Sequence, residues 1–382
     1  MTDVAVVDLG EIRAADAGRV GPKMARLGQL AADGWRVPDG YAVTAASLDG
    51  WLPAPARGEL ARLFTAPAPG HSELTRLAER ARSLIESQPL PPWLEDAVAA
   101  AHARLASRTG RGAGLRVAVR SSAVGEDGRA ASFAGQYETY LGVSGVTDVL
   151  LHVRRCWASG FSAHALAYRR RFGGPVFGST GPARGHDLAV GVLELVDARS
   201  AGVVFTLDPV TGDRRVCVVE ANWGFGESVV SGQVTPDHWT VDRASGRVLS
   251  ARVGAKLTWA SFSPADGQVT LSPLPAELAG RACLSEDEVR YVCDRAAAIE
   301  SAAGGVPQDV EWAIARDLPF PGNVFFLQHR PETTWTAARQ GSPSPEDAGG
   351  PAPAREAGRQ TAKPAFDPVQ YALRNVFKVP GA

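Results

Sequence analysis

Two strand-like segments near the C-terminal end constrain the fold most strongly. They are "PQDVEWAIA" (307–315) and "FFLQHRPET" (325–333), and the loop "RDLPFPGN" between them is rich in proline and glycine. A short loop of this kind joins antiparallel neighbours, so we expect a hairpin. Glu311 and Gln328 then face each other, with Arg330 on the same face two residues further on. Carboxylate and amide oxygens suit Mg²⁺, although a lone carboxylate on a strand is more often merely solvated.

Another strand-like segment, earlier in the chain, ends in an arginine. In "LRVAVRSSA" (115–123) apolar residues alternate with others, which places Arg120 on the face opposite the apolar one. Its guanidinium offers a planar fork of donors to phosphate oxygens. The loop that follows contains Ser132, Ala134 and Gly135, whose small side chains let backbone amides approach an anion. Many ordinary hairpins need such residues too, so the loop alone is weak evidence.

A third feature is a lysine at the start of a predicted helix. In "VGPKMARLGQL" (20–30) apolar residues recur at helical spacing after Gly21 and Pro22, which places Lys23 in the first turn. Phosphates bind favourably at helix N-termini, whereas the plain alternative is a solvated lysine. The chain contains no GxxxxGK[ST] motif and no GxGxxG motif after a strand, so a nucleotide would need another cradle.

Composition excludes several classes of protein. At 382 residues the chain is long for one core, and its net charge of -1 gives no reason to expect nucleic acid. No apolar run approaches the roughly 20 residues that span a bilayer, and the first residues lack the pattern of a signal peptide. We therefore expect a cytoplasmic protein without a membrane partner. The four cysteines form no CxxC pair, which favours reduced, partly buried thiols.

The chain divides into four parts by pattern. We predict a first lobe over residues 1–185, which includes helix-like segments from about 45 to 107, and a second lobe over 186–335. Residues 336–365 are rich in proline, glycine, alanine and serine and are typical of a flexible linker. Residues 366–382 predict a short amphipathic helix with Asp367 as N-cap and Pro368 at its first position. That helix docks either on a partner or on its own domain, and the sequence does not decide between them.

Several motifs occur together in a fixed order. This order resembles the ATP-binding region of phosphoenolpyruvate synthase and pyruvate phosphate dikinase, over roughly residues 4–334. The resemblance implies an α/β (α+β) ATP-grasp fold, in which two lobes clamp ATP between antiparallel sheets. The motifs are "VGPK", "VPDGYAVT", "VAVRSSA", "ASFAGQYET", "SAGVVFTLDPVTG", "NWGFGESVVSGQVTPD", "CLSEDEV", "PQDVEW" and "LQHRP".

The resemblance also assigns roles to residues. It implies that Lys23 and Arg120 contact phosphates, that Arg330 steadies the transferred phosphates, and that Glu311 and Gln328 hold Mg²⁺. The remaining expected contacts to ATP come from a loop over the phosphates (Ser132, Ala134, Gly135 and Gln136) and from backbone groups facing adenine (Glu194, Leu195 and Val196). The chain departs from the family at Pro22, where glycine is usual, and at Leu193, where a glutamine is usual near the base.

The family likeness leads to an expected reaction. None of the seven histidines lies in the glycine- and serine-rich context of the family's phosphohistidine, and no pyruvate-binding barrel is recognised. We therefore expect the ATP-binding catalytic subunit of a two-component phosphotransferase. It would transfer a phosphoryl group from ATP to a histidine on a partner subunit, with release of AMP and phosphate, and the partner would bind the small-molecule final acceptor.

Size and layout resemble the smaller, ATP-binding subunit of phenylphosphate synthase, for which phenol is the acceptor. A subunit acting on pyruvate or another small molecule is an alternative. Two readings from other classes stay open. One is a stand-alone ATP-grasp ligase or kinase that forms ADP without a partner, and the other is a nucleotide sensor that signals through the terminal helix.

Overall fold

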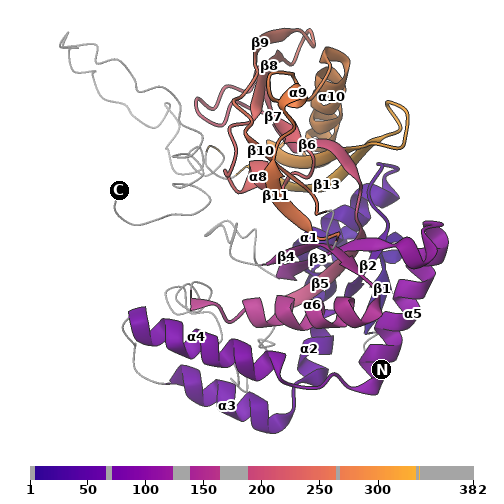
Figure 1. Ribbon diagram of the computed structural model, residues 1–382, viewed down its shortest axis with the longest axis vertical. Coiled ribbons are helices and arrows are strands. Elements are labelled where there is room, and N and C mark those ends of the chain that lie inside the picture. The colour runs from indigo at the N-terminus through magenta and orange to yellow at the C-terminus, as the bar shows by residue number, and fades with distance from the viewer. Residues whose placement is uncertain are drawn as a thin grey trace, which may run out of the picture.

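Two antiparallel sheets form the framework of the molecule. The computed structural model describes residues 5–65, 71–123, 138–163, 188–263, 267–332 and 335. A five-stranded sheet has the order β1-β2-β5-β3-β4, and a six-stranded sheet has the order β13-β12-β6-β7-β8-β9. The two sheets belong to two lobes, drawn one above the other in Figure 1. This confirms the expected ATP-grasp type of architecture.

The first lobe packs helices against its sheet, and the described residues between 45 and 108 form four helices, as the helix-like pattern predicted. Its strands are β1 (Val6–Asp8), β2 (Gly40–Val43), β3 (Arg116–Ala123), β4 (Thr139–Ser144) and β5 (Leu188–Glu194). Its helices are α1 (Ala17–Ala32), α2 (Ala45–Trp51), α3 (Ala54–Thr65), α4 (His71–Glu86), α5 (Pro92–Arg108) and α6 (Val146–Ser159). Short 3₁₀ helices lie at Leu9–Glu11, Ala14–Asp16 and Gly112–Gly114.

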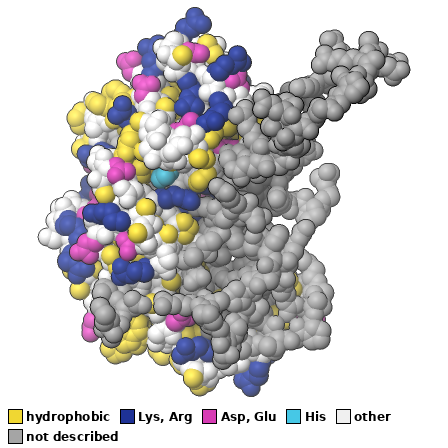
Figure 2. Space-filling model, turned by 180° about the vertical axis from the view of Figure 1, so that it is seen from behind, with side chains coloured by type: hydrophobic (Ala, Val, Ile, Leu, Met, Phe, Trp, Pro, Cys, Tyr) yellow, Lys and Arg dark blue, Asp and Glu magenta, His cyan; other side chains and the backbone are white. Residues whose placement is uncertain are grey.

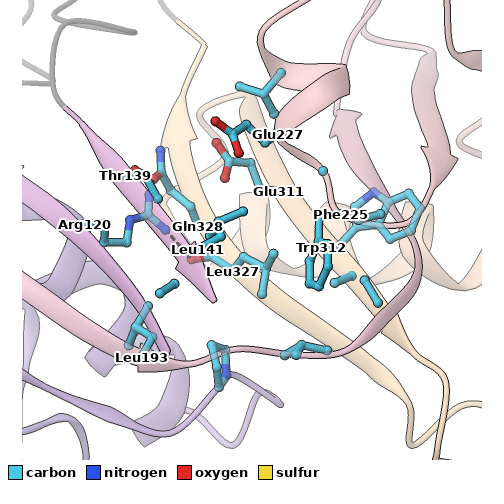
Figure 3. Close-up of a pocket in the computed structure, with 18 of the residues that line it drawn as sticks. Arg120, Thr139, Leu141, Leu193, Phe225, Glu227, Glu311, Trp312, Leu327 and Gln328 are labelled. Carbon is cyan, nitrogen blue, oxygen red and sulfur yellow. Dashed lines mark hydrogen bonds between the residues drawn. The ribbon is translucent and has the colours of Figure 1, made fainter. Parts of the chain in front are cut away.

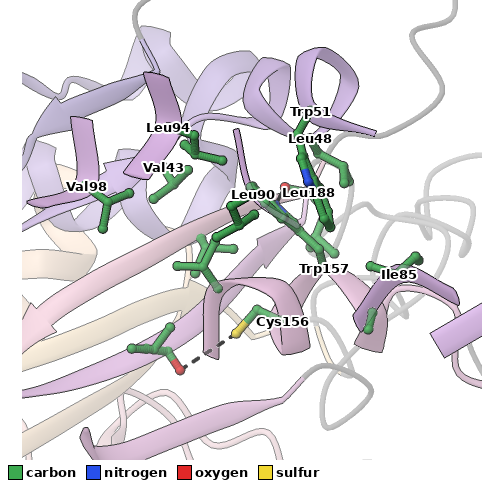
Figure 4. Packing of buried hydrophobic residues seen from close by; sticks show 14 of the residues in the cluster. Val43, Leu48, Trp51, Ile85, Leu90, Leu94, Val98, Cys156, Trp157 and Leu188 are labelled. Carbon is green, nitrogen blue, oxygen red and sulfur yellow. Dashed lines mark hydrogen bonds between the residues drawn. The ribbon is translucent and has the colours of Figure 1, made fainter. Parts of the chain in front are cut away.

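Two stacked indoles mark the core behind this sheet. The rings of Trp51 and Trp157 lie 5.1 Å apart and nearly parallel, among the apolar residues shown in Figure 4. Each buried indole also satisfies its N–H, because Trp157 Nε1 donates to Leu188 O at 3.0 Å and Trp51 Nε1 donates to Pro89 O at 2.8 Å. Strands β3 and β5 are therefore packed from behind, while their other face is partly covered by α1 and also contributes Ala118, Arg120 and Leu193 to a cavity.

A glycine lets α1 pass close to β3. The helix is interrupted at Gly21, which has φ of +73°. A Cβ at this position would lie 2.1 Å from the carbonyl oxygen of Ser122, so any other residue would force the two elements apart. The helix resumes at Pro22, which places Lys23 in a first helical turn as the sequence predicted.

The second lobe packs one helix on one face of its sheet. Its strands are β6 (Ala198–Phe205), β7 (Val216–Trp223), β8 (Asp237–Asp242), β9 (Val248–Arg252), β12 (Gln308–Ala315) and β13 (Val324–Pro331). The helices are α8 (Glu227–Val230), α9 (Ala276–Ala279) and α10 (Glu286–Ala302). Apolar residues of α10, among them Val289, Val292 and Ile299, pack with the buried Trp312 of β12. A separate hairpin is formed by β10 (Thr258–Phe262) and β11 (Val269–Pro273).

The boundary between the lobes differs from the sequence-based division. The predicted second lobe begins at residue 186, but β5 pairs with β2 and β3 in the first sheet. The continuous apolar run of Leu188–Glu194 does not reveal which sheet it joins, because a buried strand reads the same in either. The chain crosses between the sheets after Glu194. The predicted linker and terminal helix lie outside the described residues.

The surface and the cysteines agree with the composition. Basic and acidic side chains are interspersed over the described part of the face shown in Figure 2. None of the described helices is long and apolar enough to cross a membrane. All four cysteines are free thiols and are buried, whereas the sequence predicted partly buried thiols.

Candidate active site

A cavity of about 360 Å³ lies between the two sheets and takes residues from both lobes. It brings together eight positions that the sequence singled out, although the first and the last of them are more than 300 residues apart in the chain. Figure 3 shows several of the lining side chains projecting into it. The eight are Lys23, Arg120, Glu194, Leu195, Val196, Glu311, Gln328 and Arg330. The predicted loop residues Ser132, Ala134, Gly135 and Gln136 lie outside the described residues.

The β12–β13 hairpin supplies the floor of the cavity. Glu311 pairs with Gln328 across the two strands, and Asp309 pairs with Arg330, which confirms the predicted register. Arg120 reaches this floor from the first lobe, where its Nη2 donates to Oε1 of Gln328 and its Nη1 to the carbonyl oxygen of Leu327 at 3.4 Å. A single guanidinium therefore spans the cavity and connects the two sheets.

Arg330 is fixed by a carboxylate that sequence reasoning did not single out. Its Nε and Nη2 lie 2.8 and 2.7 Å from Oδ2 of Asp309. Burial raises the pKa of Asp309, and the Arg330 guanidinium opposes that shift. The other oxygen, Oδ1, is buried and has no hydrogen-bond partner in the described part of the chain. The sequence could have indicated Asp309, because it lies two residues before Glu311 on the same strand and therefore on the same face.

The oxygens at this floor fit a magnesium ion bound together with a nucleotide. Glu311 offers a carboxylate, and the amide oxygen of Gln328 has a second lone pair beside the one that accepts from Arg120. Among the described residues no group of three or more His, Cys, Asp or Glu side chains could hold a metal. Two protein oxygens, completed by phosphate and water, are the arrangement in which Mg²⁺ is usually bound at nucleotide sites.

The opposite end of the cavity is apolar and has one backbone donor left. The amide of Glu194 donates to Asp39 O at 2.7 Å and that of Leu195 to Arg116 O at 2.9 Å, whereas the Val196 amide makes no hydrogen bond to the described residues. Of the three predicted positions, Val196 is thus the one whose N–H can face a ligand. The apolar lining of the cavity includes Leu141, Leu193, Phe225, Ala313 and Leu327, which is suited to a purine ring.

Two further cavity residues were missed by the sequence. Phe225 and Glu227 both line the cavity and belong to the motif "NWGFGESVVSGQVTPD", to which the sequence analysis assigned no role in the site. Glu227 begins α8, and burial raises the pKa of its carboxyl. Figure 3 shows the carboxylates of Glu227 and Glu311 pointing into the cavity from the second lobe. The signal that could have found Glu227 is a carboxylate directly after closely spaced glycines.

Comparison with known proteins gives a family for this architecture. Residues 17–348 match the family described as pyruvate phosphate dikinase, AMP/ATP-binding domain. The chain belongs to this family. The likeness stated from the motifs is thereby confirmed, and the domain that matches is described as one that binds AMP or ATP.

Individual relatives in the pyruvate phosphate dikinase family carry different names. The chain is 37% identical over 357 residues to a probable phosphoenolpyruvate synthase of Staphylothermus marinus, covering 88% of this chain and 42% of that protein. It is 38% identical over 332 residues to rifampicin phosphotransferase of a Streptomyces species, covering 86% and 36%. It is 35% identical over 333 residues to the prodigiosin synthesizing transferase PigC of Serratia marcescens, covering 87% and 34%. The chain thus spans about two fifths of the length of these relatives.

Proposed function

We propose that this chain binds ATP with Mg²⁺ in the cavity between the lobes and transfers a phosphoryl group to a histidine on a partner subunit. In the balanced reaction, ATP, water and the histidine give AMP, inorganic phosphate and phosphohistidine. The observation that carries the proposal is the convergence of cations from both lobes on a carboxylate and an amide in one cavity.

The cationic groups suit the charge of a triphosphate. Lys23 comes from a helix start in the first lobe, Arg120 from β3, and Arg330 from β13, so the phosphates would be held from three directions. Phosphoryl transfer needs positioning and charge neutralisation more than covalent chemistry from the protein. Glu311 and Gln328 would hold a magnesium ion, which would supply neutralisation of the phosphate charge.

The acceptor histidine is proposed to come from outside the chain. No histidine lines the cavity among the described residues. His329 lies on β13 but its Nδ1 is 2.9 Å from Oε1 of Gln308, a contact that favours a role in the sheet. A partner's histidine entering at the phosphate end would complete the reaction, which is consistent with a chain that matches only part of each longer relative.

The final acceptor is proposed to be a small molecule bound by that partner. Relatives named for phosphoenolpyruvate synthesis, rifampicin phosphotransfer and prodigiosin synthesis share this domain, so the acceptor is expected to be recognised elsewhere. Among such acceptors we propose phenol, as in phenylphosphate synthase, on the basis of size and layout. Pyruvate is the alternative, and the two are separated by supplying each acceptor to the reconstituted pair.

Binding measurements on the whole chain test the ATP site. Calorimetric titration with ATP should show binding that strengthens with Mg²⁺. Arg120→Met removes charged hydrogen bonds and should weaken ATP binding by about 10- to 100-fold. Glu311→Gln should remove most of the dependence on Mg²⁺ while leaving some ATP binding.

Two matched controls guard these results. Glu286 is 69% exposed on α10, and Arg104 is 50% exposed on α5. Glu286→Gln and Arg104→Met should bind ATP like the wild type. Unchanged affinity in Arg120→Met would contradict the proposed phosphate site, and unchanged Mg²⁺ dependence in Glu311→Gln would contradict the metal site.

A further inference from the structure

The β10–β11 hairpin lies apart from both large sheets. It is attached to the second lobe near the cavity, where the Phe225 amide donates to Ala260 O at 2.9 Å and Asn222 Nδ2 donates to Thr258 O at 3.0 Å. Its five residue pairs are in antiparallel register from Thr258 with Pro273 to Phe262 with Val269. The hairpin is therefore a defined arm that begins beside one wall of the cavity.

The far end of this arm touches the first lobe. Arg116 of β3 donates from Nη1 to the carbonyl oxygen of Gly267 at 2.6 Å, and its guanidinium carbon lies 5.2 Å from the centre of the Phe262 ring. The two backbones approach closely, since a Cβ on Gly142 of β4 would lie 3.2 Å from the same Gly267 oxygen. The contact thus joins the edge of the first sheet to the hairpin by a hydrogen bond and a cation–π interaction.

The same contact leads directly to the apolar end of the cavity. The rings of Phe262 and Phe225 meet edge to face with centres 5.0 Å apart, and Phe225 lines the cavity. Leu141 of β4 also lines the cavity and belongs to the same apolar cluster as Phe262 and Val269. Arg116 contacts Phe262, and Phe262 contacts Phe225. These contacts do not involve Lys23, Arg120 or Arg330, the residues proposed to bind the phosphates.

We propose that Arg116 is a positioning residue that clasps the β10–β11 hairpin to the first lobe and thereby holds Phe225 and Leu141 against the base of the bound nucleotide. This inference rests on the proposed ATP site and names a determinant of its base-binding end. Arg116 contacts neither the phosphates nor the base, and it acts through Phe262.

A comparison of two ligands separates this role from a general effect on folding. ATP carries a base, whereas inorganic tripolyphosphate offers the phosphate end alone. Titration of the whole chain with each ligand in the presence of Mg²⁺ should show that Arg116→Met weakens ATP binding roughly five- to tenfold, because an aromatic wall loses its support. Tripolyphosphate affinity should stay within about twofold of the wild type. Arg116→Lys keeps the positive charge and can still donate a hydrogen bond but loses the planar fork. Its ATP affinity should lie between those of the wild type and Arg116→Met.

Two variants serve as references. Arg104→Met removes an arginine of α5 in the same lobe, whose Nε lies 3.0 Å from Oδ2 of Asp8 on β1, and it should leave both affinities unchanged. Phe262→Leu should weaken ATP binding selectively, and the double variant Arg116→Met/Phe262→Leu should be no weaker than the stronger single variant, because the two residues act in series.

The outcomes are distinct. Equal weakening of ATP and tripolyphosphate in Arg116→Met would overturn the proposal and assign Arg116 to folding. Unchanged ATP affinity, or additive effects in the double variant, would overturn it as well. A wild-type chain that bound neither ligand would instead refute the proposed ATP site itself.

Discussion

Glu220 gives the sharpest test of the electrostatics beside the cavity. It lies on β7 in one cross-strand row with Glu311, because Glu311 pairs with Val203 and Val203 pairs with Glu220. Burial raises the pKa of Glu220 from 4.5 to about 7, and the Arg252 guanidinium opposes the shift. Replacing it by glutamine, which keeps the size and hydrogen bonding of the protonated acid, removes the titration.

The size of the effect follows from linkage. Between pH 4.5 and 7 the unfolded chain has released the Glu220 proton while the folded chain still holds it, so the stability that this group contributes is lost as pH rises through that window. One pKa unit is worth about 1.36 kcal/mol, and from pH 5 to pH 8 the loss sums to about 2.5 kcal/mol. The free energy of unfolding of Glu220→Gln minus that of the wild type should therefore increase by about 2.5 kcal/mol from pH 5 to pH 8.

Urea unfolding of both proteins at pH 5, 6, 7 and 8 measures this difference. The comparison must be between variant and wild type, because burial lowers the pKa of the neighbouring His238 and gives a pH dependence of opposite sign. Glu286→Gln, an exposed control on α10, should show no such pH-dependent gain. A Glu220→Gln difference that is the same at pH 5 and pH 8 would refute the reasoning.

Two further changes test how the lobes are built. Lys256 and Asp237 form a fully buried ion pair, so Lys256→Met should leave an unpaired buried carboxylate and lower the free energy of unfolding by about 3–5 kcal/mol. Urea titration checks this, and Lys256→Met/Asp237→Leu should recover much of the loss. Gly21→Ala puts a Cβ 2.1 Å from Ser122 O and should displace the start of the helix that carries Lys23. Calorimetry should show weaker ATP and tripolyphosphate binding alike, whereas Gly10→Ala, with no atom within 4 Å of its Cβ, should change neither.

Local patterns predicted the positions of several cavity residues from side-chain alternation and helix-start signals. The sequence predicted that Glu311 lies opposite Gln328, and the structure pairs them, although this pairing depends on a β-bulge between Glu311 and Trp312 that the pattern did not reveal. Lys23 was placed correctly after a glycine and a proline, whereas β3 does not end at Arg120 as expected but continues to Ala123. These positions depend on the residues nearest to them in the chain.

Other features depend on contacts between distant segments, and the sequence could not show them. The assignment of β5 to the first sheet depends on its pairing with β2 and β3 rather than on its own apolar residues. The clasp between Arg116 and Gly267 joins residues 151 apart, and its geometry follows from how the lobes pack. Phe225 lines the cavity because β10 supports its backbone, which the pattern of glycines around it does not reveal.

A product assay tests the central claim most directly. The purified chain is incubated with ATP and Mg²⁺, alone and with a candidate partner that carries a histidine, and AMP and ADP are separated by chromatography. The account predicts AMP and inorganic phosphate in equal amounts, formed only when the partner is present, and lost in Arg120→Met. ADP formed by the chain alone would contradict it and assign the cavity to an independent kinase or ligase.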